Sequence, residues 1–313
     1  MSAPTVMWIK QLLAAALWLA LATAALASPL PALVSILDGD AVLLRDSGRF
    51  ALAEGVRLGS GDLIETDAKA RLLRLEFADG SLVDLGPGTR VLVAPRLGTR
   101  ATAAAPQLYV LQGWFKLSTP ATSGQAPALP PLVFTPAQAL TLPSGQQVVS
   151  VEAAGVQAFC EAGGVTLQSR AAKAATSVKL KAGEYFAQSP QAGATDKAVV
   201  TPRPPSAFIQ AVPRSFLDPL PLRAALFKGR DVVPKRLADL AYDDVSDWLS
   251  AEPALRSYFV GQWRALARRP DFRAALAARM RSHPEWDRIV FPEKYLPKPA
   301  APAPVAKPPM ARH

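Results

Sequence analysis

The chain has one cysteine, Cys160, and two histidines, His283 and His313, among its 313 residues. A single cysteine excludes a disulfide within the chain, so the fold must depend on its apolar core. We expect Cys160, in the strand-like stretch VQAFCEAGG, to be a small buried residue. Without a histidine before His283, no His-based triad or zinc site is expected in the N-terminal two-thirds of the chain.

Other signatures of catalysis are missing as well. The sequence has no G-x-S-x-G, no C-x-x-C, no phosphate-binding P-loop and no G-x-G-x-x-G. We therefore expect a non-enzymatic protein without a cofactor, and keep an enzyme of unknown class as a minor alternative.

An uncharged apolar run occupies residues 11–27 and follows the single charge of Lys10. It ends in Ala25-Leu26-Ala27, which has the A-x-A pattern of a signal-peptide cleavage site. The run is shorter than the roughly 20 apolar residues that a membrane-spanning helix needs. We expect residues 1–27 to be a signal peptide cleaved after Ala27, giving a periplasmic protein. The alternative is retention as an inner-membrane anchor.

Positive charge is concentrated in the C-terminal third. Residues 28–200 carry 15 Lys and Arg against 14 Asp and Glu, whereas residues 201–313 carry 19 against 11. Nucleic acid is not expected as a partner of an exported protein, so the basic third points to another anionic surface.

Between residues 32 and 186 apolar and polar residues alternate with a period of two. In LRLEFADGSLVDL, two alternating runs flank Asp79-Gly80, which is a strong hairpin signal. The fold class we predict is mainly β: a two-sheet β-sandwich or β-roll over residues 28–200, followed by a small all-α region. Further strands are expected at Ala41–Leu44, Leu108–Leu117, Gln147–Val151, Gly155–Phe159, Val165–Leu167 and Val178–Leu180.

Beyond residue 200 the pattern changes. Prolines from Pro202 to Pro221 predict an extended linker over residues 201–230. Residues 231–296 show helical spacing, with one helix expected after Pro234, a second around Phe259 and a third from Pro270 to before Pro284. The Pro/Ala/Lys tail over residues 297–313 is expected to be disordered.

One seven-residue phrase occurs twice. Residues 56–62 read VRLGSGD and residues 178–184 read VKLKAGE, both following V-[KR]-L-x-[SA]-G-[DE]. Two inward strand residues followed by Gly and an acid describe the entry to a tight turn. We predict two equivalent strand–turn units within one domain.

The run that follows the first copy carries a family resemblance. GDLIETDAKARLLRLEFADGSLVDLGPGTRVLV closely resembles the FecR-type domain, which is marked by G-D-x-I-x-T, F-A-D-G-S and L-G-P-x-T. The match is specific over residues 34–95, looser over 145–188 and absent beyond 200. The resemblance implies an exported, β-rich, non-enzymatic module of the kind found in regulators that relay an envelope signal. Because only about ten residues precede the apolar run, we expect any relay to pass through a protein partner.

The residues that carry the resemblance are interpreted as structural. We expect turn-forming roles for Gly61, Asp62, Asp79, Gly80, Gly86 and Gly88. The neighbouring acids also raise the alternatives of a calcium site or a catalytic carboxylate pair, although turn geometry explains Asp/Gly pairs more simply; these acids are Asp38, Asp40, Asp62, Glu65 and Asp67.

Arginines crowd the last predicted helices. Arg264, Arg268, Arg273 and Arg281 are the candidates for binding an anionic partner, and Arg273 and Arg281 are expected two turns apart on one helix face. A merely solvated face is the alternative. The partner could be an envelope protein, or an anionic lipid or cell-wall polymer bound by a scaffold; the oligomeric state is not indicated.

The export hypothesis has a direct test. N-terminal sequencing of the protein recovered from the periplasm should begin at Ser28. Full-length protein that stays in membranes after alkaline extraction would show that the apolar run is an anchor.

Overall fold

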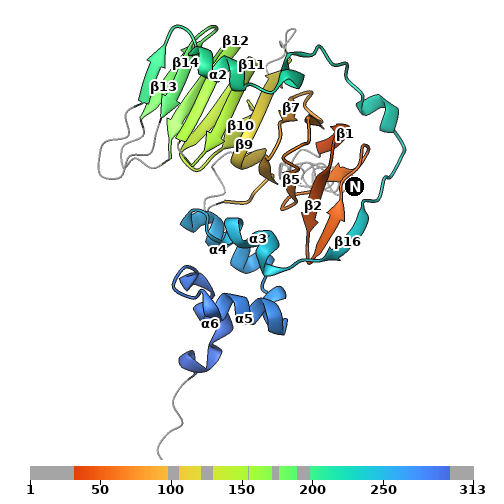
Figure 1. Cartoon of the computed structure of the whole chain (residues 1–313), viewed down its shortest axis with the longest axis vertical. Coiled ribbons are helices and arrows are strands. Elements are labelled where there is room, and N and C mark those ends of the chain that lie inside the picture. Colours follow the sequence, from red (N-terminus) through yellow and green to blue (C-terminus); the bar gives the residue numbers. More distant parts are fainter. Residues whose placement is uncertain are drawn as a thin grey trace, which may run out of the picture. The chain divides into compact units, whose positions relative to one another are not determined.

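The structure, a computed structural model, describes residues 32–97, 106–120, 130–153, 155–170, 176–188 and 198–296. The predicted signal peptide and C-terminal tail lie outside these ranges. The chain forms two compact units, which divide between Leu240 and Ala241. The first is built on a large mixed β-sheet and the second is helical (Figure 1), which confirms the predicted mainly β class with a helical C-terminal region. None of the described helices is long and apolar enough to span a bilayer.

The N-terminal half of the β unit has two branches that meet at one long strand, β9 (Leu108–Thr119). β8 pairs with the first half of β9, and β7 pairs with its second half. The branch ending in β8 contains β2 (Ala41–Arg45), β3 (Gly48–Ala51), β5 (Leu63–Thr66) and β8 (Arg90–Val93). The branch ending in β7 contains β1 (Ala32–Asp38), β4 (Arg57–Leu58), β6 (Leu72–Phe77) and β7 (Leu82–Leu85).

The second half repeats this division. β12 pairs with β14 along its first half and with β13 along its second half, so it too is shared between two branches. The strands of this half are β10 (Leu132–Phe134), β11 (Gln138–Glu152), β12 (Gly155–Ser169), β13 (Ser177–Lys181), β14 (Tyr185–Gln188) and β15 (Ala198–Thr201). The hydrogen-bonded sheet is therefore continuous but branched.

The long strands that are shared between branches contain glycines near the points where the strand changes from one partner strand to another. Gly113 in β9, Gly145 in β11 and Gly163 in β12 all have positive φ. A Cβ on Gly145 would lie 2.0 Å from the Ala162 carbonyl oxygen, so the two backbones touch there. The β11–β12 register also shifts on either side of this point. Glycine is required here for both conformation and space.

The main apolar cluster of the β unit includes buried residues of both halves, from Ala32 to Phe186, and a second, smaller cluster contains Phe208 and Phe216 of the Pro-rich segment. Cys160 belongs to it and is fully buried, and this burial raises the pKa of its thiol. The predicted hairpin is present: β6 and β7 pair across a turn in which Gly80 has φ of 81°.

The two copies of the repeated phrase adopt the same local structure. Gly61 has φ of 91° and Gly183 has φ of 89°. In the first copy the Asp62 carboxylate accepts from the Gly59 amide at 2.7 Å. In the second, the Glu184 carboxylate accepts from the Lys181 amide at 2.8 Å. The first phrase joins β4, which pairs with β1, to β5, which pairs with β2. The second joins β13 to β14, which pair with opposite halves of β12, so each acid-stabilised turn marks a change of branch.

The Pro-rich segment is docked on the β unit. Residues 202–234, here called the strap, connect β15 to β16 (Lys235–Asp239), which are the two ends of the longest strand path of the sheet (Figure 1). The strap contains α2 (Ser206–Ala211) and the short 3-10 helices η2 (Arg214–Leu217) and η3 (Ala224–Phe227). The segment expected to be a linker over 201–230 instead has Phe208, Phe216 and Phe227 buried.

The helix expected to start directly after Pro234 starts only at Tyr242, so the predicted start is wrong. Residues 235–239 form the edge strand β16, which pairs antiparallel with β3. The Leu240 amide then donates to the Ser47 carbonyl. The three-residue spacing of Leu237 and Leu240 fits a helix, but backbone pairing with β3 outweighs that local pattern.

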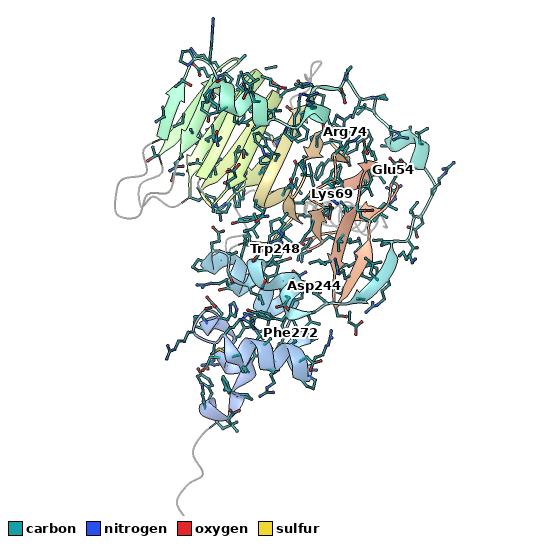
Figure 2. All side chains as sticks on the ribbon, in the orientation of Figure 1. Glu54, Lys69, Arg74, Asp244, Trp248 and Phe272 are labelled. Atoms are coloured by element: carbon teal, nitrogen blue, oxygen red, sulfur yellow. The ribbon has the colours of Figure 1, made fainter. Side chains whose placement is uncertain are left out.

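The helical unit is built around aromatic side chains. Trp248, Trp263 and Trp286 are essentially inaccessible to solvent, and Phe259 stacks on Trp263 with ring centroids 4.3 Å apart. Trp248 and Phe272 are labelled in Figure 2. The elements are α3 (Tyr242–Leu249), α4 (Pro253–Gln262), η4 (Leu266–Arg268), α5 (Pro270–Ala278), η5 (Pro284–Trp286), α6 (Asp287–Val290) and η6 (Pro292–Tyr295).

The glycine contact between β11 and β12 can be tested against a matched glycine. Gly145→Ala adds a methyl group against the Ala162 carbonyl and should lower the free energy of unfolding by more than about 3 kcal/mol. Gly183 also has positive φ, but nothing lies within 4 Å of the position that a Cβ would take there. Gly183→Ala should therefore lose only about 1–2 kcal/mol. Equal losses in urea unfolding would contradict the close-contact explanation.

Candidate functional site

The two ends of the FecR-like motif meet at a pair of threonines. The Thr66 hydroxyl donates to the Gly86 carbonyl at 2.7 Å and accepts from the Thr89 amide at 2.8 Å. The Thr66 amide donates to the Thr89 carbonyl at 2.9 Å. Both side chains are buried. The G-D-x-I-x-T and L-G-P-x-T segments therefore hold each other in place.

The motif acids make internal hydrogen bonds. Asp62 is buried and accepts from Arg45 through Nε at 2.8 Å and Nη2 at 2.6 Å. This hydrogen bonding raises the pKa of Arg45, whose guanidinium remains charged. Asp79 accepts from the Ser81 amide at 2.9 Å and from Gln107 Nε2 at 2.8 Å. Both carboxylates thus fix turns.

The motif glycines serve two different requirements. Gly61, Gly80 and Gly88 have positive φ. Gly86 instead lies against Trp114, and a Cβ there would come within 2.9 Å of the Trp114 Cβ. The first three meet a backbone requirement, while the fourth permits close packing.

An open polar groove lies beside the threonine pair, with a volume of about 520 Å³. Asp40, Glu65 and Asp67 contribute negative charge, and Arg49 and Arg90 contribute positive charge. Its other lining residues are Ala41, Val42, Thr66, Ala68, Gly88 and Gln112. The walls come from β2, β3, β5, β8 and β9 with their adjoining turns. A mixed-charge, open groove suits a polar polypeptide segment or another ligand that carries both charges.

The acids considered for metal binding are dispersed among basic partners. Asp38 pairs with Arg71, and Glu65 lies 3.6 Å from Arg90. Among the described residues, no group of three or more His, Cys, Asp or Glu side chains could hold a metal ion. Three of the five acids therefore have arginine partners, since Asp62 pairs with Arg45.

The four candidate arginines are exposed in the helical unit, but they do not share one helix face. α5 ends at Ala278, so Arg281 lies in the following turn and the expected two-turn spacing from Arg273 is wrong. The Arg273 guanidinium donates to the Val290 carbonyl. The side chains of Arg264, Arg268 and Arg281 make no hydrogen bond or ion pair with any residue in the described ranges.

Two features escape prediction from the sequence because their partners are distant in the chain. One is the groove, whose walls come from strands between residues 40 and 112. The other is a buried pair in the helical unit, with Tyr242 Oη 2.6 Å from His283 Nε2. Burial lowers the pKa of His283 and raises that of Tyr242. The only sequence signal for this pair is that His283, the first histidine of the chain, lies in a segment rich in tryptophan.

Comparisons with known proteins give a limited result. No family model and no curated protein matches the chain. Two crystal structures of a candidate anti-sigma factor from Parabacteroides distasonis align with a TM-score of 0.35 and 14% identity, covering 58% of this chain and 87% of that chain. A likeness at this level carries no functional argument.

The buried histidine gives the helical unit a predictable pH dependence. Since the folded-state pKa of His283 lies below its unfolded value near 6.5, the unfolded state binds more protons in acid. Stability should be greatest above about pH 6.5 and should fall as the pH drops below it. The helical circular dichroism signal should therefore melt at a lower temperature near pH 5.5 than near pH 7.5.

His283→Gln is the matched control for this effect, because Gln keeps a polar side chain that does not titrate. Its melting temperature should depend less on pH over the same range. If the melting temperature of the wild-type protein falls no further between pH 7.5 and pH 5.5 than that of the Gln variant, His283 is not the cause.

Proposed function

We propose that the chain is a non-enzymatic FecR-like interaction module, exported to the periplasm, that relays or scaffolds through a protein partner of the envelope. The proposal rests first on the residues that resemble the FecR-type domain. In the fold these residues meet one another through the Thr66–Thr89 contact, so the motif specifies a local architecture.

The polar groove is the observation that supports binding most directly. It is bordered by the motif residues Thr66 and Gly88, and its charged side chains have both signs. Asp40 and Asp67 are exposed at its margin. A protein segment with alternating charges would find complementary groups there, and this favours specificity and orientation of a partner.

A photo-crosslinking side chain at Gln112 tests this function. Gln112 is exposed, lines the groove and lies on the rigid strand β9. A probe placed there should crosslink one defined envelope protein in living cells. The same probe at Lys179, exposed on β13 outside the groove, should not crosslink that protein.

Reversing one charge in the groove should remove the binding that the Gln112 probe detects. Asp40→Arg alters an exposed groove side chain and should change the free energy of unfolding by less than about 1 kcal/mol. Combined with the Gln112 probe, it should remove most of the crosslinked product. Undiminished crosslinking in this variant, or equal crosslinking from Lys179, would contradict groove-mediated binding.

The helical unit supports a second candidate function, an envelope scaffold that binds anionic lipid or cell-wall polymer. The supporting observation is the exposure of Arg264, Arg268 and Arg281 without ion-pair partners in the described part of the chain. Such binding would weaken with salt, because screening acts strongly on exposed charges. Replacing these arginines with Gln should then reduce retention on wall preparations while the buried aromatic core remains intact.

A further inference from the structure

Exposed large apolar side chains are concentrated on one segment of the β unit. Of the ten in the described residues, eight lie between Val199 and Leu237, on β15, the strap and β16. They are Val199, Val200, Ile209, Leu217, Leu222, Leu226, Val233 and Leu237. The remaining two, Tyr295 and Leu296, belong to the helical unit. Five of the eight, Ile209, Leu217, Leu222, Leu226 and Val233, lie on the strap itself.

The strap displays these side chains because its neighbouring residues are anchored inward. Phe216 is 2% exposed while the adjacent Leu217 is 69% exposed. Phe227 is 8% exposed while the adjacent Leu226 is 57% exposed. Leu222 lies between these two anchors and is 69% exposed. We call Leu217, Leu222 and Leu226 the outward leucines.

Polar contacts hold the backbone of this stretch against the sheet. The buried Glu76 carboxylate accepts from the Arg223 and Ala224 amides at 2.8 and 3.1 Å. Arg74 Nη1 donates to the Leu220 carbonyl at 3.0 Å, and Lys116 Nζ donates to the Phe216 carbonyl at 2.9 Å. The outward leucines are thus presented by an already ordered backbone, which reduces the entropy lost on binding.

The surrounding charge is positive. Between residues 214 and 230 there are four basic residues and one acid, Asp218. Arg214, Lys228 and Arg230 are exposed and form no ion pair with other described residues. Protruding aliphatic side chains interleaved with Lys and Arg are the combination that binds the surface of an anionic bilayer.

The chemistry of the side chains favours a bilayer over a protein partner. The large exposed apolar residues of the strap are all aliphatic, and Leu and Val are under-represented among protein-binding hot spots. The polar groove has no lining residue from the strap. We propose that the strap binds an anionic membrane surface, with the outward leucines entering the headgroup–acyl boundary and the nearby basic side chains contacting lipid phosphates. The inference does not depend on the proposed protein partner.

Vesicle binding by a chain beginning at Ser28 tests the proposal. This chain retains every described strand and helix and omits the apolar run 11–27, which would itself enter a bilayer. It should bind phosphatidylcholine vesicles containing phosphatidylglycerol and bind pure phosphatidylcholine poorly. Leu217→Gln, Leu222→Gln and Leu226→Gln together should lower the partition coefficient about tenfold or more.

Two control variants separate the strap from other surfaces. Tyr295→Gln with Leu296→Gln removes the two exposed large apolar side chains of the helical unit and should leave the partition coefficient unchanged. Arg264→Gln, Arg268→Gln and Arg281→Gln together remove three exposed charges of the helical unit. If this variant still binds vesicles in a way that depends on the outward leucines, the result supports binding through the strap. Unchanged melting of the leucine variant in solution would exclude unfolding as the cause of its loss.

A fluorescence probe distinguishes insertion from simple adsorption. Leu222→Trp should show a blue-shifted emission on anionic vesicles and should be quenched by brominated acyl chains. An unquenched Trp, or a triple leucine variant that binds like wild type, would overturn the proposal. If the triple variant loses a crosslinked envelope protein and keeps its vesicle binding, the strap docks a protein and the bilayer assignment is wrong.

Discussion

A buried ion pair connects the sheet to the strap. Arg74 binds Asp84 through two hydrogen bonds of 2.6 and 2.8 Å, and both side chains are nearly inaccessible to solvent. The same guanidinium also binds the Leu220 carbonyl, while Glu76 on the same strand binds two strap amides. Glu54 adds a further contact, an ion pair with Arg223 of the strap. Arg74 and Glu54 are both labelled in Figure 2. Removing either member of a buried pair leaves an uncompensated charge, so these groups act together.

The strap in turn determines how the β unit ends. It leads from β15 to β16, and β16 covers the outer side of β3. β16 contains Lys235, Arg236 and Asp239 and pairs through an irregular register, both of which protect an edge from further strand addition. The strap therefore buries its phenylalanines against the β unit and leaves its large aliphatic side chains exposed.

Local patterns in the sequence predicted the parts that depend on near neighbours. Alternation around Asp79-Gly80 predicted a hairpin that is present, and the repeated phrase predicted two turns that share glycine geometry and an acid-to-amide bond. Pro270 does begin α5. The predictions that failed concern contacts between residues that are far apart in the sequence. Prolines excluded regular structure from the strap but did not indicate that Phe216 would be buried on a sheet, and helical spacing at Leu237 concealed pairing with β3. The groove likewise depends on strand order, which no local pattern encodes.

The distance in sequence between the strap and its binding residues has a consequence for the order of folding. Arg74 and Leu220 are separated by 146 positions, and Glu76 and Ala224 by 148. Arg74 and Asp84, by contrast, are only ten positions apart. Contacts of such long range form late, because closing a long loop is entropically unfavourable. The sheet is therefore expected to form before the strap covers it, which leaves Arg74 and Glu76 in contact with water during that interval.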